Sequence, residues 1–380
     1  MVYSPEGTNK RLSTTPPRRV FETNLTVGRL RIRRKASSAV MATLLVVAIA
    51  VAPSTTYVWS TNLAGALMGT GGVDWAKKKI SQTTSTYTSV TVTNTYPGNT
   101  TSKTSLMLAG IAVGPGFDES KAKLVTQARI AWIRTDVQLS SDFHNAYSVA
   151  SRNRINIVGI LDYDTLNWNS SFTLQDWKSA VAKAQSAYPL IHVWEIWNEP
   201  TLPKYRLGYM DGSPQHYVDL LRSAYETLKA GDAQATVIGL GGVLLGRPGD
   251  LDFAKAVFAD GGNAVMDAYS VHAYPGDLNI GKNWEYYNQL WTQELQQYKA
   301  FGKPLWVTET GLESTQLTEA DQSEFLTKSY SFFVQQGASA FIWFQLKDYY
   351  GSDGTFVACG LVRVDMTTKP SYVTYRNCIK

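Results

Sequence analysis

Residues 155–200 decide the fold. They read INIVGILDY (155–163), DTLNWNSSFT (164–173), LQDWKSAVAKAQSA (174–187), YPLI (188–191) and HVWEIWNEP (192–200). The first and last segments are short apolar runs with strand composition, whereas residues 174–187 space their apolar side chains three and four positions apart, as an amphipathic helix does. A strand, a helix and a second strand in this order predict a pair of parallel strands joined by a crossover helix.

The same unit repeats along the chain from Leu106 to its end. Eight apolar runs alternate with amphipathic or polar stretches: 106–113, 130–137, 155–163, 192–200, 235–243, 266–275, 303–311 and 338–347. Two of the stretches between them, 217–230 and 319–336, also read as helices, and Thr318 is placed to cap the second. Eight strand–helix units over 275 residues predict an α/β fold, a (β/α)8 TIM barrel spanning 106–380.

Polar residues gather where the predicted strands end. Arg134, Asp162 and Tyr163 end the second and third runs, Asn198 and Glu199 the fourth, His272 and Tyr274 the sixth, Glu309 the seventh, and Trp343 lies in the eighth. Because the carboxyl ends of barrel strands meet at one mouth, we expect Glu199 and Glu309 to face each other there. Two such carboxylates about 5–5.5 Å apart cleave a glycosidic bond with retention of the anomeric configuration. At a separation of about 6.5–9.5 Å they cleave it with inversion.

The fourth and seventh runs make this chemistry specific. The segment HVWEIWNEP (192–200) resembles the strand-four signature of clan A retaining glycoside hydrolases, the group that includes the cellulase-like family 5 and the xylosidase-like family 39, and WVTETG (306–311) resembles their strand-seven ending. The arginine after strand two, the His-x-Tyr of strand six and the tryptophan of strand eight match Arg134, His272 with Tyr274, and Trp343. Family 5 members commonly have a histidine after strand three, where this chain has Leu161-Asp-Tyr163, so the resemblance favours a family-39-like relative.

The resemblance implies a role for each matched residue. Glu199 would be the general acid/base, with a pKa that burial and a second carboxylate raise, and Glu309 the ionised nucleophile. Arg134, Asn198, His272, Tyr274 and Trp343 would form the substrate-binding set, with Asn198 on the sugar 2-hydroxyl and Trp343 as the floor of the subsite beside the scissile bond.

Other readings of the same residues remain open. Arg134 could instead form a structural salt bridge with Glu195, which we interpret as a satisfied barrel carboxylate, and His272 could be a hydrogen-bonded wall residue. Further aromatic residues in the loops could serve either as sugar platforms or as core: Trp168, Trp284, Tyr286, Tyr287, Tyr349 and Tyr350.

The segment before the predicted barrel indicates export. Residues 1–35 carry nine basic and two acidic side chains, a net charge of +7, and an uncharged stretch with an apolar run at 39–52 follows. A basic flank before an apolar run is typical of a signal peptide or of a signal-anchor helix in residues 36–59, and a buried core helix is the remaining alternative. We therefore expect a basic cytoplasmic tail (1–35), a membrane or signal segment (36–59) and an extracellular protein, either membrane-anchored or secreted.

Two further segments complete the organisation. Residues 60–105 are expected to be a linker, because 15 of the 25 residues in 81–105 are serine or threonine and bury little apolar surface; an edge hairpin is the alternative. The chain has two cysteines, Cys359 and Cys378, which in an exported protein could form one disulfide or stay two unrelated thiols.

Charge and composition narrow the function. The chain carries +5 in all, so the 345 residues after the basic tail carry −2, which argues against a nucleic-acid binder. Four histidines without close ligand spacing give no indication of a catalytic metal, and no cofactor is implied. The prediction is a retaining glycoside hydrolase acting on a β-linked polysaccharide or oligosaccharide; the alternatives are a surface-anchored carbohydrate-binding pseudoenzyme and a transglycosidase on the same site.

Overall fold

The computed structural model of the chain describes residues 107–379 except 115, 276–283, 316 and 352. The barrel strands are β1 (Leu108–Ala112), β2 (Trp132–Asp136), β3 (Asn156–Leu161), β4 (Val193–Ile196), β5 (Thr236–Leu244), β6 (Ala268–Ala273), β7 (Leu305–Thr310) and β8 (Ala340–Trp343). The α-helices are α4 (Glu119–Gln127), α5 (Ser141–Arg152), α6 (Leu174–Ala187), α7 (Pro214–Gly231), α8 (Asp250–Ala259), α10 (Trp284–Lys299), α11 (Glu319–Gln335) and α12 (Pro370–Cys378). Short elements complete the described part: the 3-10 turns η1 (Pro203–Tyr205) and η2 (Gly262–Val265), and a hairpin of β9 (Tyr349–Tyr350) and β10 (Phe356–Val357).

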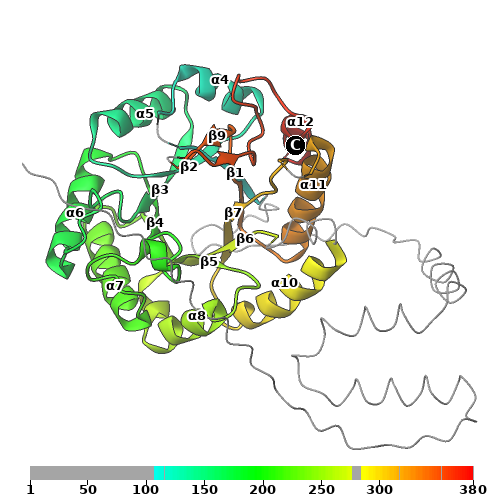
Figure 1. Cartoon of the computed structure of the whole chain (residues 1–380). Helices are drawn as coiled ribbons and strands as arrows, with labels where there is room; N and C mark the ends of the chain where they lie inside the picture. The colour runs from blue at the N-terminus through cyan, green and yellow to red at the C-terminus, as the bar shows by residue number, and fades with distance from the viewer. Residues whose placement is uncertain (1–106, 115, 276–283, 316, 352, 380) are drawn as a thin grey trace, which may run out of the picture. The chain divides into compact units, whose positions relative to one another are not determined.

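The eight long strands form a closed parallel barrel in chain order, with β8 pairing back to β1. Helices surround the barrel on the outside, as the view along its axis shows (Figure 1). Seven of the eight predicted runs contain one of these strands and the remaining run, 235–243, ends one residue before β5 does, so the predicted (β/α)8 barrel is confirmed. The runs could be recognised because strands of a parallel barrel are buried on both faces and read as nearly continuous apolar sequence.

Side chains divide between the inside of the barrel and the layer under the helices. The inner cluster consists of strand side chains that point into the barrel, including Val158, Ile238, Trp306 and Ile342. The larger outer cluster packs the other strand faces against the helices. Strand side chains alternate between these two layers, and this alternation decides which residues can reach the mouth.

The helix ends follow the capping signals. The α6 bounds are those predicted, and Thr173 caps the helix in a reciprocal capping box with Asp176. Thr318 and Asp321 form a second capping box at the start of α11, as the sequence indicated. The α7 helix begins three residues earlier than predicted, at Pro214, because Ser213 accepts a hydrogen bond from the backbone of His216.

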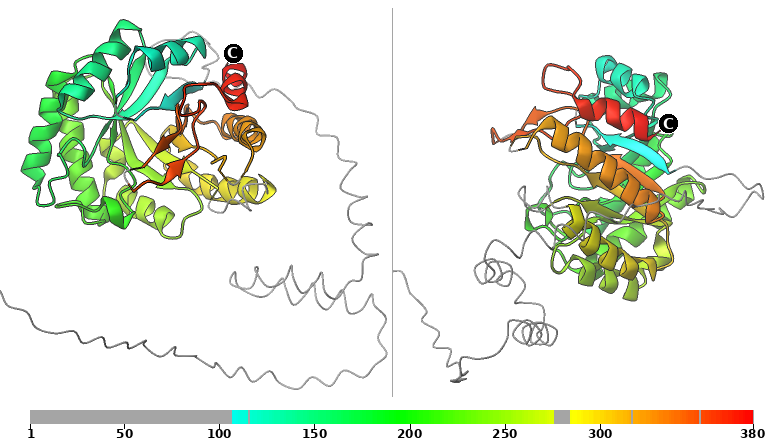
Figure 2. Two further views of the ribbon diagram at one scale, coloured as in Figure 1. Left: turned by 45° about the horizontal axis from the view of Figure 1, so that its top comes forward. Right: turned by 90° about the vertical axis from the view of Figure 1, so that its right-hand side faces the viewer.

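The two cysteines are free, so the disulfide between Cys359 and Cys378 that we considered is not formed. Lys369, at the start of α12, donates to the carbonyl of Ala358, and Cys378 is the last residue of that nine-residue helix. Figure 2 shows α12, the red helix at the C-terminus, beside the orange helix α11.

The predicted tail, membrane or signal segment and linker (1–35, 36–59 and 60–105) lie outside the described residues. Within the residues that are described, no helix has the length and apolar character needed to cross a bilayer.

Candidate active site

A cavity of about 720 Å³ opens at the carboxyl ends of the strands. Arg134, Asn198, Glu199, Tyr274 and Glu309 all line it, so the structure brings together both predicted catalytic carboxylates and three of the five predicted substrate-binding residues. His272 and Trp343 are fully buried beside it.

Glu309 is held by two donors. Arg134 Nη1 donates to Oε1 at 2.6 Å, and the Tyr274 hydroxyl donates to Oε2 at 2.6 Å. Burial and the Glu309 charge both raise the pKa of Tyr274 well above its ordinary value, so the phenol keeps its proton and remains a donor. These bonds fix the orientation of the Glu309 carboxylate in the cavity.

Arg134 also performs the structural role that we considered for it. Its Nε donates to Glu195 Oε2 at 2.5 Å, and Glu195, fully buried inside the barrel, accepts a second bond from Thr308 Oγ1 at 2.8 Å. Burial acts to lower the pKa of Arg134, but the carboxylates of Glu195 and Glu309 outweigh it, so the pKa is raised. One buried guanidinium therefore joins the barrel interior to the site.

A strand irregularity places Glu309. Thr308 points into the barrel toward Glu195, and alternation would turn the next side chain outward. The register of β7 shifts against both neighbours in this region, between Val271 and His272 on one side and between Val307 and Thr310 on the other. The irregularity lets two consecutive side chains, Thr308 and Glu309, face the inside and the cavity.

Glu199 sits on a strained turn after β4. Its φ angle is +46° and that of Trp197 is +69°, both in the left-handed region that non-glycine residues seldom adopt. The turn is held because the Glu199 amide donates to the Gly241 carbonyl at 2.6 Å. Strain of this kind persists where the surroundings enforce it and is characteristic of functional sites.

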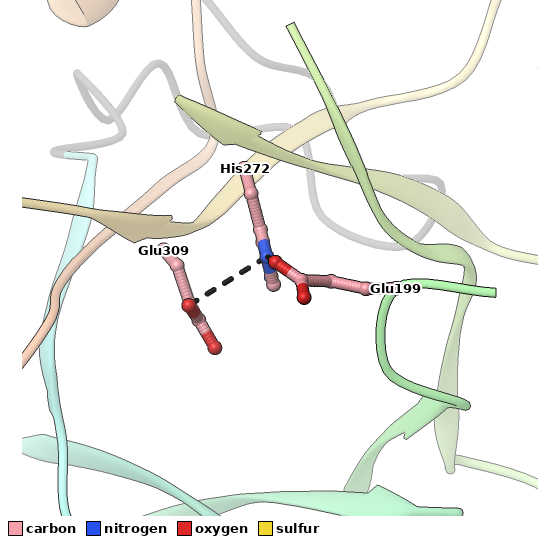
Figure 3. A group of neighbouring side chains, drawn as sticks. All are labelled: Glu199, His272 and Glu309. Carbon is pink, nitrogen blue, oxygen red and sulfur yellow. Dashed lines mark hydrogen bonds and ion pairs between the residues drawn. The ribbon is translucent and has the colours of Figure 1, made fainter. Parts of the chain in front are cut away.

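His272 lies between the two carboxylates (Figure 3). Its Nδ1 is 3.0 Å from Glu199 Oε1 and 3.6 Å from Glu309 Oε2, and its Nε2 is 3.4 Å from Arg134 Nη2. Because a guanidinium can only donate, His272 Nε2 is the acceptor. The ring proton is then on Nδ1, which donates a hydrogen bond to Glu199. Since the ring is fully buried, His272 is better described as a hydrogen-bonded residue in the wall of the site than as a residue that touches substrate.

The pKa of Glu199 differs from our expectation. Burial acts to raise it, but the hydrogen bond from His272, with the charges of Lys204 and Arg134, outweighs burial, and the pKa is lowered from 4.5. The expected raised pKa is therefore wrong for the free protein, because the nearest donor, rather than the second carboxylate, dominates.

Asn198 is oriented by its neighbours. Arg134 Nη2 donates to its Oδ1 at 3.0 Å, and its Nδ2 is 3.4 Å from the Tyr163 hydroxyl. With its oxygen engaged by Arg134, the amide nitrogen remains as the donor toward the cavity that Asn198 lines.

Trp343 is not the floor of a subsite. It is fully buried, packs on Phe325 of α11 and donates to the carbonyl of Cys359 at 2.9 Å. Ala340 and Ile342 face the barrel interior, so alternation turns Trp343 outward and Phe344 inward. Phe344 lines the cavity and is the aromatic residue of this strand end that a sugar can meet.

Other aromatic residues divide between core and cavity. Tyr287 is buried, and Trp284 packs against Trp291, Phe325 and Phe332, so both belong to the core. Tyr349 and Tyr350 line the cavity, whereas Trp168 stacks on Tyr163 at 4.3 Å between ring centroids.

Sequence reasoning missed Lys204 and Tyr205, which line the cavity from η1. The Lys204 ammonium lies 4.3 Å from the centre of the Tyr205 ring, and that ring stacks on Tyr163 at 4.8 Å. Their position in the loop after β4 was the available signal, because barrel sites are built from such loops.

In the described part of the chain, two groups of residues bring three potential metal ligands within 4.8 Å of one another. One is Glu199, His272 and Glu309, whose atoms already bond to each other, to Arg134 and to Tyr274. The other is Asp136, Asp162 and Asp164 at the ends of β2 and β3. Burial, then neighbouring carboxylates, raise the pKa of Asp136 to about 6 and that of Asp162 well above its ordinary value.

Several solved structures with a similar fold are glycoside hydrolases. A family 39 glycoside hydrolase from the gut symbiont Bacteroides cellulosilyticus WH2 is 22% identical, with a TM-score of 0.53 over 72% of this chain and 63% of that one. A family 39 β-xylosidase from Caulobacter crescentus is 17% identical, with a TM-score of 0.53 over 71% and 70% of the two chains. An endo-1,4-β-D-mannanase from Thermotoga petrophila RKU-1 is 12% identical, with a TM-score of 0.53 over 72% and 99%.

A search of curated protein sequences finds no match. The family model described as glycosyl hydrolase catalytic core matches residues 131–355, which contain both glutamates and their buried partners. This chain therefore belongs to the glycosyl hydrolase catalytic core family.

Proposed function

We propose that the chain is a retaining glycosidase that cleaves β-O-glycosidic bonds of a polysaccharide or oligosaccharide by double displacement. One observation carries the proposal: an oxygen of Glu199 and an oxygen of Glu309 lie within 4.8 Å of each other at one cavity. That separation is closer to the about 5–5.5 Å between the carboxyl groups of retaining enzymes than to the about 6.5–9.5 Å of inverting ones, and so supports retention.

The partners of the two glutamates support different roles for them. Arg134 and Tyr274 each donate to one oxygen of Glu309 and hold it oriented, as a nucleophile requires. In the first step a Glu309 oxygen bonds to the anomeric carbon while the bond to the leaving oxygen breaks, and that oxygen takes a proton from Glu199. In the second step ionised Glu199 takes a proton from water, the water oxygen bonds to the anomeric carbon, and Glu309 leaves as a carboxylate.

His272 suits the second step directly, because its hydrogen bond stabilises ionised Glu199. For the first step Glu199 must be protonated. A lowered pKa therefore predicts that the free enzyme works best at acidic pH on substrates whose leaving group needs the proton.

The substrate class rests on the cavity and the relatives. The aromatic faces of Phe344, Tyr349 and Tyr350 line the cavity and suit the C–H faces of sugar rings. The names of two structural relatives, a β-xylosidase and an endo-1,4-β-D-mannanase, suggest β-linked substrates.

Kinetics on a panel of aryl β-glycosides tests the roles. Glu309→Gln and Glu199→Gln should each lower kcat, the first by about 10⁴-fold or more, while Glu313→Gln, a matched control on the loop after β7, should stay near wild type. Azide should restore turnover to Glu309→Ala and give a glycosyl azide of inverted configuration. Near-normal turnover in both glutamine variants would refute the proposal, and glycan binding without hydrolysis in the wild type would favour a binding protein.

We also propose that the enzyme acts outside the cytoplasm, because a basic tail followed by an apolar run is typical of exported proteins. Fractionating cells that make the full chain should place the glycosidase activity in the membrane or the medium. Activity confined to the soluble cytoplasm would contradict the proposal.

A further inference from the structure

Three aspartates meet at the wall of the cavity. Asp136 ends β2, and Asp162 and Asp164 follow β3, its neighbour in the barrel. Each offers a carboxylate oxygen, and these oxygens all lie within 4.8 Å of one another. Asp136 lines the cavity, so the group is reached from solvent on that side.

One of these carboxylates has an unused oxygen. Asp162 is fully buried, and its Oδ1 accepts the backbone N–H of Asp164 at 2.9 Å. Its Oδ2 is also buried and has no hydrogen-bond partner among the described residues. A buried carboxylate oxygen without a partner costs free energy, so it points to a ligand that the protein atoms do not supply.

The nearby positive charge is already engaged. Arg134 acts electrostatically on Asp136 and Asp162, but its N–H groups are bonded to Glu195, Glu309 and Asn198. Asp164 Oδ1 accepts neutral donors, Gln138 Nε2 at 3.3 Å and Trp168 Nε1 at 3.1 Å. Three carboxylates at this spacing therefore repel one another without a cation bonded to them.

The donors select the kind of ion. Carboxylate oxygens are hard ligands that suit Ca²⁺ and Mg²⁺ rather than zinc. The flexible coordination of Ca²⁺ suits carboxylates from two loops, whereas Mg²⁺ demands a nearly ideal octahedron.

We propose that Asp136, Asp162 and Asp164 form a calcium-binding site that ties the ends of β2 and β3 together at the cavity wall. The site does not include the two glutamates, so binding of Ca²⁺ to it does not depend on whether the enzyme is retaining. Bound Ca²⁺ favours the folded state by mass action, so it should raise the melting temperature.

The experiment titrates the purified, metal-stripped full chain with Ca²⁺ and with Tb³⁺. Tyr163 and Trp168 lie beside the ligands, with Trp168 Nε1 bonded to Asp164, so bound Tb³⁺ should emit on excitation of these rings. We expect sensitised Tb³⁺ emission that Ca²⁺ displaces, and a melting temperature that rises with Ca²⁺ up to about millimolar concentration. Mg²⁺ should produce a smaller shift.

Single substitutions test whether the three aspartates bind the ion. Asp136→Asn and Asp162→Asn keep side-chain volume and remove one charge each, and both should lose the emission and the Ca²⁺-dependent shift. Asp252→Asn, at an exposed position of α8, should retain both. Should Asp162→Asn fail to fold, the half-buried Asp136 and the wild-type titration still decide the question.

Two results would overturn the site. One is a wild-type chain with neither sensitised emission nor a shift at millimolar Ca²⁺. The other is the same emission and shift in Asp136→Asn and Asp162→Asn as in the wild type. A rise in melting temperature of Asp162→Asn without any metal response would identify a shared proton in place of the ion.

Discussion

Replacing Gly242 with alanine should disable the site through His272. Gly242 lies in an irregular part of β5 where Leu240, Gly241 and Gly242 have φ angles of +69°, +55° and +73°. A Cβ at Gly242 would lie 2.5 Å from His272 Cε1 and closer still to Nε2 and Cδ2. Carbon atoms in contact are about 3.5–4.0 Å apart, so the ring must move by about 1 Å or more.

The size of the effect follows from that displacement. Moving the ring lengthens the 3.0 Å bond to Glu199 and the 3.4 Å contact with Arg134. A misplacement of about 1 Å costs about 100-fold in rate, equivalent to about 2.7 kcal/mol of activation free energy. Alanine in the left-handed region should also destabilise the fold by about 1–2 kcal/mol.

Gly249→Ala is the matched control. Gly249 has a φ angle of +89°, and a Cβ there would meet no atom within 4 Å, so the variant bears the backbone cost alone. Measurements of kcat/KM on an aryl β-glycoside and of melting temperature should show similar destabilisation in both variants but lost activity only in Gly242→Ala. Equal activity in the two variants would refute the reasoning. A Gly242→Ala, His272→Ala double variant should be no less active than His272→Ala alone, because the clashing ring is gone.

Three further predictions follow from the contacts of the site. Arg134→Met should destabilise the chain by about 3–5 kcal/mol in urea unfolding, because it leaves a fully buried β4 carboxylate without its partner; an unchanged midpoint would contradict this. His272→Phe removes the hydrogen bond that lowers the pKa of Glu199, so that pKa should rise; since a general acid works only below its pKa, the alkaline limb of kcat/KM should move to higher pH, and a limb that stays or moves down would count against it. Phe344→Ala should raise KM with little loss of stability, whereas Trp343→Phe should lower the melting temperature and leave KM near wild type; the reverse pattern would restore Trp343 as the subsite floor.

The fold was accessible from sequence because strand burial and helix capping are local signals. Eight continuous apolar runs marked the strands, and Thr318 marked the start of α11. The convergence of Glu199 and Glu309 followed from topology, since the carboxyl ends of barrel strands share one mouth.

The details that failed depend on single-residue geometry. An apolar run gives no inside or outside face, so Trp343 could not be distinguished from Phe344. The register shift that turns both Thr308 and Glu309 inward has no sequence pattern of its own. The lowered pKa of Glu199 depends on a 3.0 Å contact with His272, and such a contact is visible only in three dimensions.

The aspartate site shows a further limit. Asp162 was recognised at a strand end, but its proximity to Asp136 depends on the pairing of β2 with β3, and its unpartnered oxygen depends on the loop conformation. Neither is encoded in the spacing of residues along the chain.

The central claim, that Glu199 and Glu309 act by double displacement, is tested most directly by the configuration of the first product. Proton NMR during hydrolysis of an aryl β-glycoside by the full chain identifies the anomer released before mutarotation. Double displacement predicts the β anomer as the first sugar released, because two inversions restore the starting configuration. Initial release of the α anomer would contradict it.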